Sequence, residues 1–260
     1  MSRKKHISGF ATGPIIYPAR PTQDFYEQSL TQKYELGCKY ELEDGRVFRY
    51  AQAGASALVA GDVISSAAFG GSAATVQHDL AVQAAAAIGA TSVYLTTVTD
   101  ATTLNQYRGG YLFLTDGGAS IGQGLAPYRI IGNTAGAAGT IRFDIDRPLT
   151  IALTTSTVAA IMTNPYKAVI QAPVTTPVGM VVGVAPMAVT ATYYCWLQTW
   201  GWANVLIKTA TVIGDSVILD VGAAGSAGVS AGSEAQCIIG DTPVVIDTTD
   251  HGPVFLKICH

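Results

Sequence analysis

The sequence predicts an all-β protein, with β-sandwich or barrel-like domains behind an extended N-terminal arm. Short runs rich in Val, Ile, Thr, Tyr and Phe recur about every 8 to 15 residues, which is typical of strands in a sandwich or barrel. Gly, Asp, Asn or Pro bound these runs, as expected for tight turns. No period is fixed along the chain, so the pattern does not predict a solenoid or propeller.

The first 35 residues differ from the rest and predict the arm. Pro14, Pro18 and Pro21 interrupt a polar and aromatic segment, which excludes one regular element. Such an arm either lies along its own domain or reaches a neighbouring molecule, and the sequence leaves both open.

Strand patterns begin after the arm. The clearest lies in 39–51, where Asp44-Gly45 separates two alternating runs, a strong hairpin signal. Segment 78–90 is rich in Ala, which favours a helix, but its position among strands makes a strand the prediction. Further strand candidates are 57–67, 92–98, 111–117, 128–134, 140–146, 149–155, 167–173, 179–185, 192–200, 203–210, 216–222, 236–242 and 254–260.

Two features organise these strands. Ser- and Thr-rich residues 154–157, an apolar turn and Thr163-Asn164-Pro165 predict either a boundary or a short helical connector, which divides the chain into β-domains at 36–160 and 161–260. A Gly-Asp pair recurs at Gly61, Gly214 and Gly240, where we expect turns with Gly at positive φ and Asp capping the turn.

The composition disfavours several classes of function. The chain of 260 residues is 49% hydrophobic but only 13% charged, against about 25% in ordinary globular proteins. A weakly charged surface is common where copies pack together or bind a larger assembly. The formal net charge of −3 disfavours binding to nucleic acid, and no apolar run has the length of a membrane span. No cofactor is expected.

The cysteines, Cys38, Cys195, Cys237 and Cys259, have no zinc-type spacing. We expect free thiols, although their even number also permits two disulfides in an oxidising compartment.

Catalytic patterns are weak, and the chain is predicted not to be an enzyme. Residues 118–122 match the GxSxG elbow around Ser120, but the helix that must follow the serine is not predicted. Asp144 and Asp146 share one face of a strand, where Arg142 and Arg147 would neutralise them, so the metal interpretation is the weaker one. Asp247, Asp250 and His251 suit a turn, and no metal ligand is assigned.

All three tryptophans lie within ten residues of one another. In a regular strand, Tyr194, Trp196, Gln198, Trp200 and Trp202 fall on one face. The hypothesis preferred is that these rings form the core of the C-terminal β-domain. If the rings are exposed, they mark a subunit interface or a surface that stacks on sugar rings.

Several segments together resemble a known class of protein. They are DGRVFRYAQAGASALVAGDVI (44–64), GGYLFLTDGG (109–118), the following YRIIGN (128–133), RPLTIAL (147–153), NPYKAVI (164–170), YYCWLQTWGWANVLI (193–207) and GDSVILDVGAAGSAG (214–228). This succession resembles virion structural proteins of tailed bacteriophages of the head decoration or cement (auxiliary capsid) type. Its motifs are glycine turns and aromatic strands, so no individual functional residue is carried over.

The resemblance implies a non-enzymatic protein made in the host cytoplasm and placed on the phage head surface. It would bind the major capsid protein and stabilise contacts between capsid subunits, with further copies as partners and a trimer favoured, and without nucleic acid or membrane. The alternatives are a phage tail or fibre protein and a receptor- or carbohydrate-binding module. Candidate interface residues are Arg3, Lys4, Lys5, Tyr17, Phe25, Tyr26, Trp196, Trp200 and Trp202.

Overall fold

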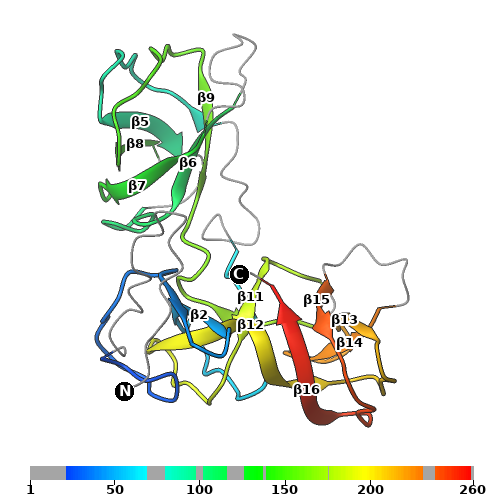
Figure 1. The fold of residues 1–260 in the computed structure, drawn as a ribbon. Coiled ribbons are helices and arrows are strands. Elements are labelled where there is room, and N and C mark those ends of the chain that lie inside the picture. Colours follow the sequence, from blue (N-terminus) through cyan, green and yellow to red (C-terminus); the bar gives the residue numbers. More distant parts are fainter. Residues whose placement is uncertain are drawn as a thin grey trace, which may run out of the picture.

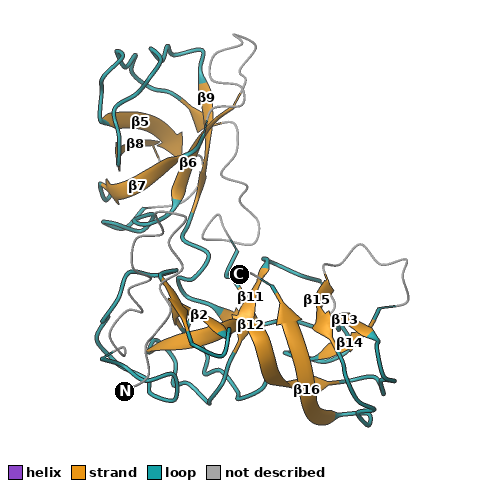
Figure 2. Ribbon diagram, viewed as in Figure 1, coloured by secondary structure: helices purple, strands orange, loops and turns teal. Residues whose placement is uncertain are grey.

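The structure, a computed structural model, describes residues 22–68, 80–97, 102–115, 126–136, 139–174, 176–230 and 238–258. These residues form strands and loops only, so the all-β prediction is confirmed (Figure 2). None of the described segments is a helix of the length and apolarity needed to cross a lipid bilayer. The strands form two bodies, a six-stranded module and a ten-stranded module (Figure 1).

The six-stranded module is barrel-like. Its strands are β4 (Leu80–Ala81), β5 (Ser92–Thr97), β6 (Tyr111–Thr115), β7 (Tyr128–Asn133), β8 (Gly139–Ile145) and β9 (Val158–Met162). They pair in the order β4-β9-β6-β7-β8-β5, and a bridge between Val82 and Leu95 brings the two ends together. The core inside holds side chains from every strand, including Leu112, Ile130 and Phe143.

The ten-stranded module is built around one long strand, β12 (Tyr194–Ile207). The first half of β12 pairs with β2 (Val47–Gln52) and β11 (Val181–Val184). Beyond these lie β1 (Lys39–Glu41) next to β2, and β3 (Val63–Ser65) and β10 (Ile170–Gln171) next to β11.

The second half of β12 belongs to a closed circuit. It pairs with β14 (Ala227–Val229) and β16 (Asp250–Lys257), and β13 (Ser216–Leu219) and β15 (Ile238–Asp241) complete the ring in the order β12-β14-β13-β15-β16-β12. Closure removes exposed strand edges from this part of the sheet. Val205, Ile207, Val217, Val254 and Leu256 fill its interior.

The strand pairing divides the chain differently from the predicted domains 36–160 and 161–260. Residues 39–65 pair with the C-terminal strands, and the six-stranded module, residues 80–162, is inserted between β3 and β10. The reason is the long-range pairing of β2 with β12, which no local pattern announces. The predicted boundary near residue 160 falls in β9, just before Asn164, where the chain returns to the large module through a turn.

Most predicted strands are present. The Asp44-Gly45 hairpin joins β1 and β2, with Gly45 at φ 84°. In 78–90, whose first two residues lie outside the described part, Leu80–Ala81 forms β4, and 192–200 and 203–210 form one strand instead of two. Strands β9 and β14 were not predicted, and 149–155 contains no strand. The Gly-Asp prediction holds for φ at Gly61 and Gly214 but is wrong for Gly240, which lies inside β15.

The described part of the arm, residues 22–35, packs along its own module. Gln23, only 3% exposed, joins it to the sheet. The Tyr50 hydroxyl donates to Gln23 Oε1 (2.7 Å), Gln23 Nε2 donates to the Tyr194 carbonyl (2.9 Å), and Trp196 Nε1 donates to the Gln23 carbonyl (3.0 Å). Of the two alternatives that the sequence leaves open for the arm, residues 22–35 therefore follow the first and lie along their own module, and residues 1–21 lie outside the described part.

Candidate functional site

The aromatic strand β12 contains a bulge that changes which side of the strand faces the core. Its pairing with β2 shifts register between Gln198, opposite Phe48, and Trp200, opposite Val47. Thr199 is the extra residue, and Gly201 follows at φ 83°. A bulge of this kind breaks the alternation of side chains along a strand.

Two core clusters show the result. Cys195 and Leu197 pack in the cluster that contains Ile64, whereas Val205 and Ile207 pack in the cluster that contains Val63. Val63 and Ile64 are consecutive in β3, so their side chains point to opposite faces. The odd-numbered residues of β12 thus face one side before the bulge and the other side after it, and the prediction that Trp196, Trp200 and Trp202 share one face is wrong.

Trp196 lies before the bulge and is 1% exposed. Its ring lies 5.0 Å from Tyr50, 5.2 Å from Tyr34 and 6.0 Å from Phe25, measured between centroids. Phe25 also stacks on Phe48 at 4.2 Å. For Trp196, the prediction of a core role is confirmed, and Phe25 joins it there, so neither ring is available as an interface anchor on this chain.

Trp202 lies after the bulge and is 53% exposed. Its ring packs edge-to-face against Phe255 of β16, with the ring centroids 5.1 Å apart and an interplanar angle of 84°. This contact orients the exposed ring. Trp202, Tyr26 and Pro253 line a groove of about 590 Å³. Tyr26, on the N-terminal segment, is 65% exposed. The groove therefore presents two aromatic side chains to solvent.

Polar groups lie around these rings. Arg46, Asn204 and His251 line the same groove, and Arg46 Nε lies 2.7 Å from Asp44 Oδ2. Because Asp44 compensates the charge of Arg46, the groove is close to neutral. Apolar ring faces beside hydrogen-bonding side chains such as Asn204 and His251 suit a flat ligand with hydroxyl groups, such as a sugar ring.

A second exposed feature is the apolar tip, which we define as Val212, Ile213, Val244 and Val245. These residues occupy two adjacent turns, which Thr211 joins by donating its N–H to the Ile246 carbonyl (3.0 Å) and its hydroxyl to the Val244 carbonyl (3.3 Å). Ile213 is 74% exposed and Val245 63%. Large apolar side chains gathered at one tip are typical of a protein-binding surface.

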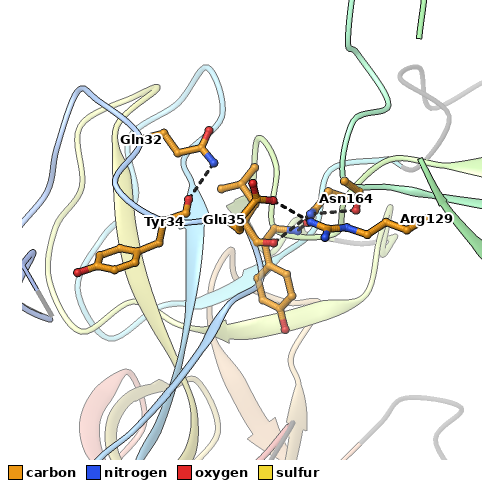
Figure 3. Close-up of polar contacts among 8 residues, drawn as sticks. Gln32, Tyr34, Glu35, Arg129 and Asn164 are labelled. Atoms are coloured by element: carbon orange, nitrogen blue, oxygen red, sulfur yellow. Dashed lines mark hydrogen bonds and ion pairs between the residues drawn. The ribbon is translucent and has the colours of Figure 1, made fainter. Parts of the chain in front are cut away.

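The junction between the two modules is polar (Figure 3). Arg129 of β7 donates to Glu35 Oε2 at 2.8 Å, which joins the small module to the N-terminal segment. Asn164, buried, donates through Nδ2 to the carbonyls of Leu36 (3.1 Å) and Gly109 (3.2 Å). Lys167 Nζ donates to the Gln106 carbonyl at 2.8 Å. These hydrogen bonds join the small module to the N-terminal segment and to the connection between β9 and β10.

The predicted interface residues therefore have different outcomes. Arg3, Lys4, Lys5 and Tyr17 lie outside the described residues. Phe25 and Trp196 are in a core cluster, Trp200 is half-buried, and Tyr26 and Trp202 meet at the groove. Sequence reasoning missed Arg46 and Asn204, and it considered His251 only as part of a turn. It also missed the apolar tip, although two consecutive large apolar residues beside a Gly-Asp turn are a usable signal.

The residues considered for catalysis or metal binding do not form a common site within the described ranges. Ser120 and its GxSxG segment lie outside the described residues. Asp144 Oδ1 pairs with Arg142 at 2.6 Å, and Asp146 accepts the N–H of Arg129 at 3.0 Å. Within the described ranges, no three His, Cys, Asp or Glu side chains gather as a metal site would require.

Among the cysteines, Cys38 and Cys195 are free thiols, as predicted, and Cys237 and Cys259 lie outside the described residues. Burial raises the pKa of Cys195 to about 12 and also raises that of Cys38, so both thiols disfavour the reactive thiolate form.

Comparison with known proteins adds no relative. No family model, no curated protein and no solved structure matches the chain.

Proposed function

We propose that this chain is a non-enzymatic structural protein of a tailed-phage virion, a head decoration or cement protein. It would bind the outside of the head across junctions between subunits of the major capsid protein, as a homo-oligomer with a trimer favoured. The likeness of its segments to proteins of that type supports this class, and the weakly charged composition is in keeping with a protein that acts through surface area.

The observation that carries the proposal is the apolar tip. Ile213 and Val245 would be costly to keep in water on a protein with no partner, and side chains of this kind anchor interfaces when a partner covers them. The closed barrel beneath supplies a rigid base for both turns. Each contact would be modest, but an oligomer bound at several points gains from avidity.

The test is co-sedimentation with empty phage heads that lack their decoration. The double variant Ile213→Asp/Val245→Asp places two charges in the tip and should abolish co-sedimentation while leaving the circular dichroism spectrum unchanged. Ile88→Asp is the matched control, because Ile88 is an equally exposed apolar residue on the other module. Equal binding by the wild type and the double variant would contradict the proposal.

The groove around Trp202 favours a second candidate, a receptor- or carbohydrate-binding module, as on a phage tail or fibre. Trp202 and Tyr26 would stack on a sugar ring while Asn204 and His251 bond its hydroxyls. This candidate predicts that saccharides quench tryptophan fluorescence in the wild type but not in Trp202→Ala. If no saccharide of a broad panel changes the fluorescence, the candidate is excluded.

A further inference from the structure

The cavity between the two modules gathers positive charge. It measures about 550 Å³ and is lined by Lys33, Arg108 and Lys167, which are three of the 15 Lys and Arg residues in the chain. Such clustering is unexpected in a chain with a net charge of −3. Cations brought to one cavity repel one another unless an anion compensates them.

The carboxylates of the described chain do not provide this compensation. No ion pair joins the three cations to a carboxylate within the described ranges, and Glu35, which also lines the cavity, pairs with Arg129 at 2.8 Å (Figure 3). Burial lowers the pKa of Lys167, which shows that its ammonium group is partly desolvated by the protein itself. An anion in the cavity would favour the charged form.

Neutral donors complete the lining. Gln32, Gln52 and Tyr194 border the cavity with groups that can hydrogen-bond anionic oxygens. A cleft between two modules, with a few convergent polar groups, is also a common position for a small-ligand site.

We propose that this cavity binds a small polyanion, a ligand whose phosphate or clustered carboxylate oxygens bridge Arg108 of the small module to Lys33 and Lys167 of the large one. The N-terminal residues that precede Thr22 do not suit it as an internal ligand, because they carry Arg3, Lys4, Lys5 and Arg20 and no carboxylate side chain. Arg108 presents a planar fork to oxygen pairs, and the two lysines add point charges.

Binding would also link the modules. Arg108 belongs to the loop 102–110, Lys33 to the N-terminal segment, and Lys167 to the connection between β9 and β10. A ligand held by all three would strengthen the junction that Asn164 and the Arg129–Glu35 pair already form. The melting temperature should therefore rise with the concentration of the anion.

The test is isothermal titration calorimetry of the full chain at low ionic strength, with inorganic phosphate in one arm and citrate in the other. Arg108→Gln should weaken binding about tenfold or more, which is the effect of losing one charged hydrogen-bonding partner. Lys39→Gln is the control, because Lys39 pairs with Glu41 on β1 and does not line the cavity. Binding of either anion supports the proposal, and the arm that binds identifies the group recognised.

Arg108→Gln decides the result, because Lys167 also bonds the Gln106 carbonyl and its replacement would disturb the junction itself. Without anion, Arg108→Gln should melt no lower than the wild type, since it relieves repulsion. The proposal is overturned if neither anion binds, or if Arg108→Gln and Lys39→Gln bind as well as the wild type.

Discussion

Trp196 and Trp202 belong to the same strand but to different environments. Trp196 is enclosed by Phe25, Tyr34, Tyr40 and Tyr50, whereas Trp202 contacts Phe255 at one edge and otherwise faces the groove. The residue type alone does not predict this difference, because both residues are tryptophans in one strand. Their different surroundings come from the bulge at Thr199 and from the segment 22–36 that covers Trp196.

We predict opposite effects on stability for the two tryptophans. Trp196→Ala should lower the free energy of unfolding by about 3–5 kcal/mol, because it removes a buried ring and leaves a cavity. Trp202→Ala should change it by less than about 1 kcal/mol, since the ring is already half in water. Urea denaturation of both variants tests this, and a loss of similar size at both positions would contradict the assigned environments.

Stability should also fall at alkaline pH. Burial raises the pKa of Cys195 from 9.0 to about 12, so above pH 9 the unfolded chain releases a proton that the folded chain retains. Folding is therefore favoured fully below pH 9 and progressively less towards pH 12. In Cys195→Ala, the decline should be shallower by up to about 1.4 kcal/mol per pH unit, the value for one proton.

The measurement is chemical denaturation at several pH values from 8 upward. Burial raises the pKa of Tyr50 to about 12 as well, from 10.0, so the variant should retain a smaller decline that begins above pH 10. Identical slopes for the wild type and Cys195→Ala would show that the thiol titrates normally in the folded chain.

At the scale of elements, the bulge in β12 decides which residues reach the groove. Gly201 adopts φ 83°, where a side chain is strained, and an added Cβ would lie 3.0 Å from Cγ of Arg46. Gly201→Ala should destabilise the protein by about 1–2 kcal/mol for the backbone alone. It should also displace Arg46 from the groove.

Gly214→Ala is the matched control, because Gly214 has φ 89° and no atom within 4 Å of an added Cβ. Thermal denaturation of both variants separates the backbone cost, which they share, from the contact with Arg46, which only Gly201→Ala has. A smaller effect at Gly201 than at Gly214 would contradict the bulge geometry.

The sequence predicted strands and hairpins well where neighbouring residues alone determine them. Asp44-Gly45 placed a hairpin, and the alternation of Ile141, Phe143 and Ile145 with polar residues placed β8 on the surface of its barrel. The small residues of β9 gave no such alternation. The bulge at Thr199 could not be predicted, because it depends on the pairing of β12 with β2 from the other end of the sequence.

At the scale of the whole molecule, the insertion of one module into the other was beyond the sequence signal. Thr163-Asn164-Pro165 did indicate a boundary, and Asn164 is the residue that bonds both modules. The groove likewise joins Tyr26 to Trp202 and His251, which lie far apart in the chain. Such sites follow from topology, so the sequence predicted Tyr26 and Trp202 as separate interface candidates but not the groove that they share.

Asn164→Ala should loosen the two modules from each other. It removes the hydrogen bonds to the Leu36 and Gly109 carbonyls inside the buried junction, which corresponds to about 1–3 kcal/mol. Calorimetry should show the unfolding transition broaden or split, with Asn204→Ala, an exposed asparagine on β12, as the control. A single sharp transition at the temperature of the wild type would contradict this account of the junction.

We propose above that the protein acts by binding a virion shell. The most direct measurement is the number of chains bound per head when empty, undecorated heads are saturated with the purified protein, together with the mass of the free protein by light scattering. The account predicts a free mass near three times the 27.0 kDa of one chain and saturation at a fixed number of chains per capsid subunit. A protein that remains a monomer and does not bind heads at any concentration would contradict it and would leave the saccharide groove as the leading explanation.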